Sequence, residues 1–193
     1  RIYAAKSRPA EHPLIVHVAD AQQARRFAAQ WPAAAEALAQ TFWPGPLTLI
    51  VPRKPSLAQA AAGGQGSIGL RVPAHPVARS LLAEALRLGV PGVAAPSANR
   101  FGRVSATSAA HVVQEFGAEL KVLDGGECPG GIESAIVDCT ALPPALLRPG
   151  LLQRAQLEAV LGTPLRERDE QSPRASGSLK SHYAPAARLR LMN

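Results

Sequence analysis

Residues 68–99 read IGLRVPAHPVARSLLAEALRLGVPGVAAPSAN, and this stretch is the most informative about the fold. It opens with the apolar run 68–72, which is typical of a β-strand. A helix is predicted over 75–88, because Gly89 stands where a left-handed cap belongs and apolar residues form one stripe at positions 77, 81, 82, 85, 86 and 88. A short buried strand over 93–95 follows. The succession of strand, helix and strand predicts an α/β domain.

The same alternation continues on both sides of this stretch. Asp20 is placed to cap a helix, and Trp43-Pro44-Gly45-Pro46 must end another, because proline cannot continue a helix. The small, glycine-rich residues 59–66 are expected to form a flexible loop, and the polar residues 164–179 a linker. The other predicted strands are 14–18, 47–51, 121–123, 135–138 and 145–147, and the other predicted helices are 21–30, 33–41, 107–116 and 153–161, the last ending at Gly162.

Length and composition narrow the class of protein. A chain of 193 residues suits one sizeable domain, and aromatic residues at 4% leave the core to Ala, Leu and Val. No apolar run approaches the roughly 20 residues that span a bilayer, and the N-terminus has no signal peptide pattern, so a cytoplasmic protein is expected. Cys128 and Cys139 lack metal-binding spacing and are expected to be free thiols. The net charge of +7 is compatible with RNA or another polyanion as partner.

Polar residues able to bind a ligand occur in short segments that also contain Gly or Pro. In an extended Lys6-Ser7-Arg8-Pro9 segment, Lys6 and Arg8 would project to one side and could hold a triphosphate between them, although a solvated basic segment fits equally well. Ser97 and Asn99 follow a predicted strand, where open α/β sheets place ligand groups. They could instead serve only the hydrogen bonds of a local turn.

Two arginines are predicted to stand at strand ends. Arg71 and Arg148 each precede a proline within two residues, and each could bind a ligand or an internal carboxylate. His17 lies in an apolar run and, on its own, is interpreted as a core histidine. The glycines around Cys128 precede Glu133-Ser134 and could present backbone N–H groups to an oxyanion, but they match no standard nucleotide-binding pattern. No Ser-His-Asp triad, metal-binding His pair or paired glycosidase carboxylates are apparent.

Taken in order, these segments resemble the YrdC-like threonylcarbamoyl-AMP synthase family over about residues 1–150. The resemblance rests on Lys6-Ser-Arg-Pro9, Pro13-Leu-Ile-Val-His17-Val, Phe42-Trp-Pro-Gly-Pro-Leu-Thr48, Gly69-Leu-Arg-Val-Pro73, Pro96-Ser-Ala-Asn99 with Gly102 and Ser105, and Arg148-Pro-Gly150. It implies an open, twisted, mixed α/β sheet with flanking helices and a basic concave cleft. It also implies a nucleotidyltransferase that condenses L-threonine, bicarbonate and ATP into threonylcarbamoyl-AMP and pyrophosphate for tRNA modification.

The resemblance assigns a role to each candidate residue. Lys6 and Arg8 would be catalytic, as cations that stabilise the charge developing on the α-phosphate. The residues implied to bind ATP are Lys6, Arg8, Ser67, Ser97, Asn99, Ser105, Arg148 and Tyr183, and those implied to bind threonine are His17, Arg71 and Ser134. Mg²⁺ is expected to enter with ATP, with no metal site of the protein's own. Further expected partners are tRNA and downstream threonylcarbamoyl-transfer proteins, and no membrane partner is expected.

The chain also departs from the family pattern. The family's first strand and its Pro-Thr-x-Thr-x-Tyr-Gly-Leu motif precede the Lys-x-Arg segment, so the sequence is expected to be N-terminally incomplete. Ser134-Ala135 replaces a Ser-Thr pair and Lys6-Ser7-Arg8 replaces Lys-Gly-Arg, and both changes are expected to weaken binding. Residues 1–162 are interpreted as the catalytic domain, and residues 163–193 as an interdomain linker that lies across the active site, with Tyr183 near ATP, ahead of a C-terminal domain that this chain lacks.

Two other functions remain open at this point. One is carbamoyl-adenylate chemistry, as in the related domain of hydrogenase-maturation carbamoyltransferases, although the acylphosphatase and zinc-finger-like regions of those proteins do not appear here. The other is a non-catalytic module that binds double-stranded RNA or tRNA through its positive charge. An RNA-binding module has no need for Ser97, Ser134 and Arg148 together, so their joint presence favours the enzyme.

Overall fold

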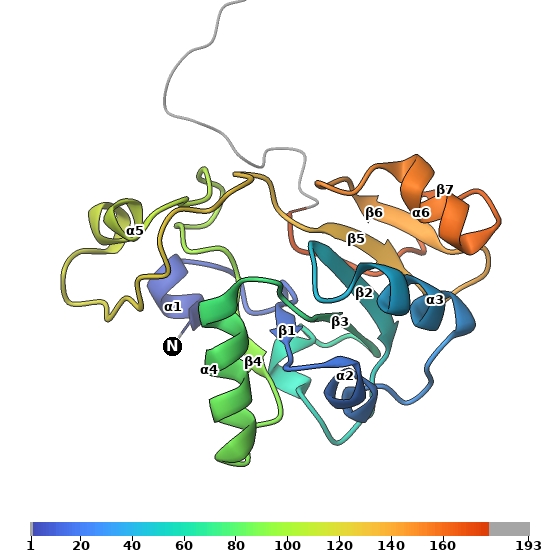
Figure 1. Ribbon diagram of the computed structural model, residues 1–193, viewed down its shortest axis with the longest axis horizontal. Coiled ribbons are helices and arrows are strands. Elements are labelled where there is room, and N and C mark those ends of the chain that lie inside the picture. The colour runs from blue at the N-terminus through green and yellow to red at the C-terminus, as the bar shows by residue number, and fades with distance from the viewer. Residues whose placement is uncertain (1, 178–193) are drawn as a thin grey trace, which may run out of the picture. The chain divides into compact units, whose positions relative to one another are not determined.

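The computed structural model describes residues 2–177, which divide into two compact units. The first unit holds residues 2–9 and 97–131 together with Gly177. The second holds residues 10–96 and 132–176 and contains the whole β-sheet (Figure 1).

The sheet has seven strands in the order β4-β1-β3-β2-β5-β6-β7. It is mixed, because β1 with β3, β2 with β5 and β6 with β7 are parallel pairs while the other neighbours are antiparallel. The strands are β1 (Ile15–His17), β2 (Leu47–Pro52), β3 (Ser67–Arg71), β4 (Val93–Ala94), β5 (Ala135–Asp138), β6 (Ala145–Arg148) and β7 (Arg166–Glu167). The mixed α/β sheet predicted from the sequence is confirmed.

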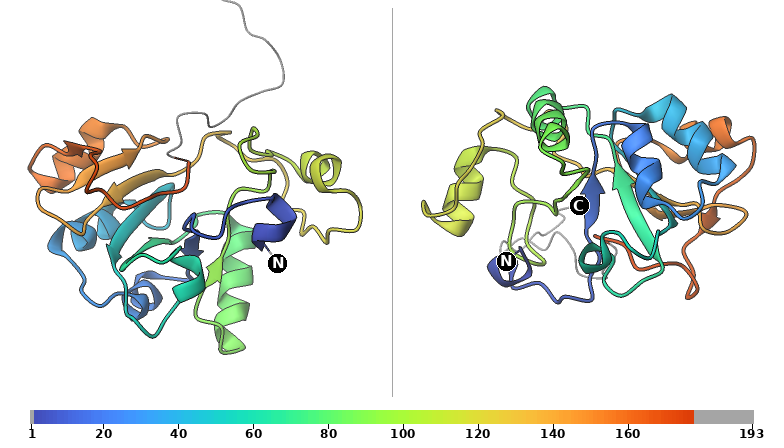
Figure 2. Two further views of the ribbon diagram at one scale, coloured as in Figure 1. Left: turned by 180° about the vertical axis from the view of Figure 1, so that it is seen from behind. Right: turned by 90° about the horizontal axis from the view of Figure 1, so that it is seen from below.

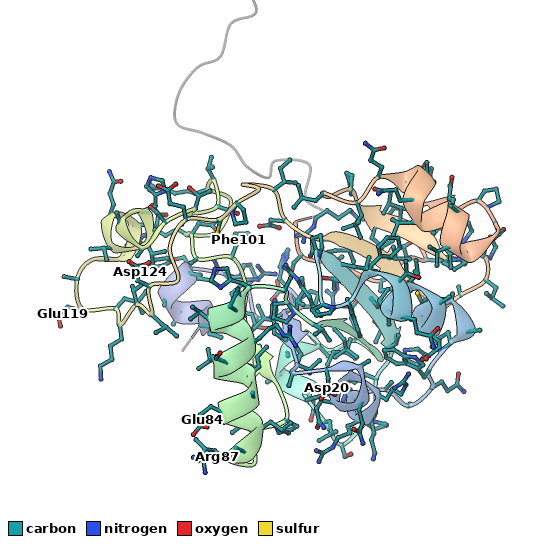
Figure 3. The ribbon with its side chains drawn as sticks, in the orientation of Figure 1. Asp20, Glu84, Arg87, Phe101, Glu119 and Asp124 are labelled. Carbon is teal, nitrogen blue, oxygen red and sulfur yellow. The ribbon has the colours of Figure 1, made fainter. Side chains whose placement is uncertain are left out.

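Helices cover one face of this sheet. The helices α2 (Ala21–Phe27), α3 (Ala33–Phe42) and α6 (Arg154–Leu161) lie together on that face, and Asp20 begins α2 by accepting a hydrogen bond from Gln23 N at 2.8 Å (Figures 2 and 3). Residues 174–176 lie over the opposite face, where Ala175 packs with Ile50 and Ile136. The apolar run of β2 is buried between these two layers, which explains why its residues do not alternate with polar ones.

The first unit is built differently. It contains α1 (Ile2–Lys6) and α5 (Ala109–Phe116), and Ser108 caps α5 through His111 N. Among its described residues no hydrophobic side chain is fully buried. Its buried side chains are those of Lys6, Arg8 and Asn99. Polar contacts therefore organise this unit in place of an apolar core.

Three segments differ from the sequence-based expectation. Residues 121–123 form no strand, because they pair with no neighbour in the described sheet and Leu123 is 66% exposed. Residues 59–66 are not simply a flexible loop, since Gln59–Ala61 form a 3₁₀ turn with Ala61 buried. The expected linker 164–179 contributes strand β7 and buries Leu165 and Ala175, so part of this segment packs against the core. The domain boundary near residue 162 stays a prediction.

Two elements form where predicted but are more exposed than expected. Strand β4 is an edge strand that pairs only with β1 and is half-buried. Helix α4 (Pro76–Arg87) ends before Gly89, which has the expected left-handed φ of 83°. Of its apolar stripe only Leu82 is fully buried, and Leu81 is 50% exposed. A stripe predicts which side of a helix faces the protein, and the depth of burial depends on what packs there.

Candidate functional site

The sheet topology places three predicted site residues at the same edge. His17 ends β1, Arg71 ends β3 and Arg148 ends β6, and these three strands run in the same direction. Strands β2 and β5 run the other way, so they begin at this edge, and Ser134 immediately precedes β5. Residues separated by more than 100 positions in sequence therefore meet at one end of the sheet.

The same residues also share one face of the sheet. His17 and Arg71 are register partners, and Arg148 is the partner of Ile136, two residues after Ser134. Because side chains alternate between faces along a strand, His17, Arg71, Ser134 and Arg148 lie on the face over which residues 174–176 run, opposite the helices. We call these four residues the edge cluster. Sequence motifs predicted its members, and the topology brings them together.

Arg148 is the most constrained member of the edge cluster. Its side chain is 6% exposed. Its Nε and Nη2 groups donate to Ser134 O at 3.0 and 2.8 Å, and Nη2 also donates to Ser134 Oγ at 3.1 Å. Its Nη1 group donates to Ser176 O at 3.0 Å and to the Glu133 carboxylate. Arg148 thus fixes the start of β5 and residues 174–176 at once.

Arg71 is more open. Its Nε donates to Gly45 O at 3.1 Å, and within residues 2–177 its two Nη groups contact no acceptor. Burial lowers the pKa of Arg71, and the positive charge of Arg148 lowers it further, while Glu133 acts in the opposite direction. Arg71 remains charged at neutral pH because an arginine pKa starts so high. A half-buried guanidinium whose two Nη groups make no hydrogen bond within the described residues is suited to binding a carboxylate or phosphate.

Sequence reasoning missed two polar residues beside the edge cluster. Glu133 pairs with Arg148, and Thr48 Oγ1 lies 2.8 Å from Ser134 Oγ. Thr48 is 1% exposed in a strand that is otherwise apolar, and this isolated hydroxyl was the signal that could have identified it. Glu133 stood next to a predicted site residue, but nothing in the sequence pairs it with Arg148, 15 positions away.

His17 is half-buried at this edge, and its Nδ1 atom is buried without a hydrogen-bond partner among the described residues. Burial lowers the pKa of His17 to about 4, with the neighbouring charge of Arg71 adding to the effect. The imidazole is therefore neutral at physiological pH. Such a ring can donate or accept one hydrogen bond at each nitrogen, but it adds no positive charge to the two arginines.

We expect the free energy of unfolding to fall as pH is lowered from about 6.5 toward 4. The folded-state pKa of His17 lies below the ordinary value of 6.5, so the unfolded chain takes up this proton first and is favoured in that window. The His17→Gln variant lacks the titration. Urea unfolding at pH 7 and pH 5 should therefore show a smaller loss of stability in the variant than in the parent protein, and equal losses would contradict the assignment.

Ser67 belongs to the same unit but not to the edge cluster. It begins β3, whereas Arg71 ends it, so about 13 Å separates them at roughly 3.3 Å per residue. Ser67 instead lines a small cavity of about 20 Å³ on the same face, together with Thr48, Gly69 and Ser176. The cavity exists partly because Gly69 has no side chain between Thr48 and Ile15. It can hold about one water molecule.

The first unit contains Lys6 and Arg8, and their backbone conformation differs from the predicted one. The prediction that residues 6–8 are extended is wrong, because Lys6 ends α1 and Ser7 has a left-handed φ of 53°. Glycine, which the resemblance implies at this position, adopts that conformation without strain. Lys6 Nζ donates to Ser97 O at 2.5 Å and to Asn99 O, and Arg8 lies 5.7 Å from the centre of the Phe101 ring. Carbonyl dipoles and an aromatic face thus hold the two cations.

Asn99 organises the turn that receives Lys6. Its Nδ2 donates to Arg100 O at 2.9 Å and Arg103 O at 2.8 Å, whereas its buried Oδ1 has no partner among the described residues. The local-turn interpretation of Asn99 is therefore correct for the amide nitrogen. Asn99 and Ser105 also line a cleft of about 560 Å³ between this turn and α5.

The remaining sequence-based expectations are placed as follows. Tyr183 lies outside the described residues. Cys128 is exposed, Cys139 is buried and both thiols are free. The glycine-rich residues around Cys128 are exposed. Within residues 2–177 no helix is long and apolar enough to cross a membrane.

Comparison with known proteins gives two family matches. Residues 1–150 match the family model for Sua5, YciO and YrdC, described as telomere recombination. Residues 152–193 match the model described as the threonylcarbamoyl-AMP synthase C-terminal domain. The chain is 40% identical to the threonylcarbamoyl-AMP synthase of Pyrococcus abyssi over 195 residues, 98% of this chain and 56% of the relative. It is also 40% identical to that of Bacillus subtilis over 196 residues, 98% of this chain and 55% of the relative.

Solved structures agree with these matches. The crystal structure of Pyrococcus abyssi Sua5 complexed with L-threonine superposes with a TM-score of 0.87 and 41% identity, covering 97% of this chain and 56% of that one. The structure of Escherichia coli YciO, at 20% identity and a TM-score of 0.66, covers 79% of this chain and 72% of that one and supports the fold alone. The chain spans about half the length of the curated relatives it matches. On its sequence and its fold together, this chain belongs to the threonylcarbamoyl-AMP synthase family of Sua5, YciO and YrdC.

Proposed function

We propose that the protein containing this chain is an L-threonylcarbamoyl-AMP synthase, which uses L-threonine, bicarbonate and ATP and releases pyrophosphate. The observation that carries the proposal is the edge cluster: an open Arg71, a fixed Ser134 hydroxyl and a neutral His17 side by side, in a chain 40% identical to threonylcarbamoyl-AMP synthases over 98% of its length. The Sua5 neighbour was solved with L-threonine, which supports an amino-acid site in this fold.

In this proposal the edge cluster binds the amino acid. The two Nη groups of Arg71 match a carboxylate in a bidentate arrangement, and the Ser134 hydroxyl is available for a further hydrogen bond. The threonine nitrogen joins the bicarbonate carbon with loss of water, which gives a carbamate. A carbamate oxygen then attacks the α-phosphate of ATP, a new P–O bond forms, and the bond to the departing pyrophosphate breaks.

The second step brings one anion onto another, so cations must supply the stabilisation. We assign this role to Lys6 and Arg8, which are buried and held by Ser97 O, Asn99 O and the Phe101 ring. Mg²⁺ enters as part of the ATP substrate, bound by phosphate oxygens. The remaining residues that we propose for ATP are Ser67, Ser97, Asn99, Ser105, Arg148 and Tyr183. We also propose that the product serves tRNA modification, with tRNA and threonylcarbamoyl-transfer proteins as later partners in the cytoplasm.

The test is pyrophosphate release by the full-length protein in the presence of ATP, bicarbonate and L-threonine. We expect release to require L-threonine and to be much slower with L-serine or L-valine, since one lacks the methyl group and the other the hydroxyl. Equal rates with threonine and serine would contradict the amino-acid site.

The Arg71→Ala variant should raise the KM for L-threonine about ten- to a hundredfold, because one charge-assisted pair contributes roughly 1.5 to 3 kcal/mol. The KM for ATP should change much less. Arg87→Ala is the matched control, because Arg87 forms an exposed ion pair with Glu84 on the solvent side of α4 (Figure 3). An unchanged threonine KM in Arg71→Ala would show that the carboxylate binds elsewhere.

A further inference from the structure

Every N–H donor of Arg148 is engaged by the protein. A guanidinium has five such donors. In Arg148 the Nε donor and the two Nη2 donors are directed to Ser134, and the two Nη1 donors to Ser176 O and Glu133. An anion that binds Arg148 directly must therefore replace one of these acceptors.

Glu133 differs from the other acceptors in two respects. Ser134 O and Ser176 O are backbone carbonyls, held in place by the chain itself, whereas the Glu133 carboxylate ends a rotatable side chain just before β5. Glu133 is also the one charged acceptor of Arg148 within residues 2–177, and at 18% exposure it is the more accessible partner of the pair, since Arg148 is 6% exposed. Replacing Glu133 leaves the backbone contacts of Arg148 intact.

The charges of the edge cluster point to the same residue. Arg71 and Arg148 are close enough to repel one another, and Glu133 offsets this repulsion. With His17 neutral, the two arginines and Glu133 carry a net charge of +1, whereas the arginines alone carry +2. A phosphate group carries about two negative charges and gains more from the second arginine than a carboxylate does.

We propose that Glu133 is an internal competitor for Arg148, which a phosphate of the nucleotide or of pyrophosphate must displace and which weakens the binding of polyanions at this edge. The inference rests on the proposed function for the identity of the anion. In the reaction, Glu133 returns to Arg148 as pyrophosphate leaves, so the ion pair favours release of this product. Glu133 is thus a specificity-determining residue that limits product inhibition.

The experiment measures pyrophosphate binding to the full-length protein by isothermal titration calorimetry at low ionic strength. Glu133→Gln keeps an acceptor for Arg148 Nη1 but removes the charge. We expect the Kd for pyrophosphate to fall about tenfold, because the removed negative charge opposes the anion across a partly solvated site, which weakens the repulsion. The difference should shrink as salt is added, because mobile ions screen the charges.

Two variants control for structural effects. Glu133→Asp keeps the charge, so its Kd should stay within about threefold of the parent value, a difference of under 1 kcal/mol. Glu84→Gln removes a carboxylate from an exposed ion pair on α4 and should leave the Kd unchanged. If Glu133→Gln binds pyrophosphate no more tightly than the parent protein, or more weakly, Glu133 orients Arg148 instead of competing for it, and the proposal is wrong.

This outcome is separable from that of the proposed function. Pyrophosphate binding requires no turnover, so tighter binding by Glu133→Gln supports the competitor role even if L-threonine does not stimulate pyrophosphate release. Conversely, the enzyme could require L-threonine for pyrophosphate release while its Kd for pyrophosphate stays the same in Glu133→Gln. That result would support the proposed function and refute this inference. In the supporting case, inhibition of turnover by pyrophosphate should also strengthen about tenfold in Glu133→Gln, matching the binding change.

Discussion

Replacing Arg148 with alanine is expected to lower the free energy of unfolding by about 3–5 kcal/mol, the range for removing one partner of a buried ion pair. The variant removes the positive charge beside the Glu133 carboxylate and the Arg148 N–H donors that bond Ser134 O and Ser176 O. All three acceptors then lose a partner that water can replace only in part. Urea unfolding followed by circular dichroism measures the change directly.

Two further variants sharpen this prediction. Arg148→Lys keeps the positive charge but loses the planar fork that reaches Ser134 and Ser176 together, so its stability should fall between those of the parent and Arg148→Ala. Arg87→Ala removes an arginine from an exposed pair and should change stability by less than about 0.5 kcal/mol. A loss for Arg148→Ala no larger than that for Arg87→Ala would show that the network at the sheet edge contributes little.

The second large effect is expected for Gly150→Ala. A Cβ atom at Gly150 would lie 2.2 Å from Ala135 N, 2.7 Å from Glu133 O and 2.7 Å from Ser134 C. These are backbone atoms at the start of β5, so no side chain can rotate away to make room. We expect a loss of about 3 kcal/mol or more, at the upper end for an overpacked site, together with a higher KM for L-threonine as Ser134 shifts.

Gly66→Ala is the matched control for this substitution. A Cβ atom at Gly66 meets no heavy atom within 4 Å, and its backbone is not left-handed. The same chemical change should therefore be neutral or slightly stabilising there, because alanine restricts the unfolded chain. If thermal unfolding shows similar losses for the two variants, close packing of Gly150 against β5 is not the cause.

The strands and helices could largely be predicted from local sequence. The run Leu47–Val51 is apolar without alternation, Asp20 precedes a helix, and Gly89 and Gly162 follow helices, and each of these signals acts over a few residues. Residues 121–123 show the limit of this reasoning. Three residues of suitable type become a strand only if a neighbouring strand offers them hydrogen bonds, and local sequence carries no information about that neighbour.

The sequence by itself also determined which residues to consider at the site. Arg71 and Arg148 were predicted at strand ends from local sequence, whereas His17 and Ser134 were assigned to the site only through the family resemblance. The sheet edge at which the four residues meet follows from the strand directions. Pairing between strands links positions as distant as His17 and Arg71 through backbone hydrogen bonds, which are the same for nearly every residue type. The order of the strands in the sheet therefore cannot be predicted from any one segment of the sequence.

Only the tertiary structure decided which hydrogen bonds and ion pairs each charged side chain forms. Arg71 and Arg148 look alike in sequence, each at a strand end shortly before a proline, yet one has an open fork and the other has all five donors engaged. The difference arises because Glu133 and Ser176 reach Arg148 from other parts of the chain. Electrostatic and hydrogen-bond energies depend on distances between side chains in space, and folding sets those distances by packing segments that are remote in sequence.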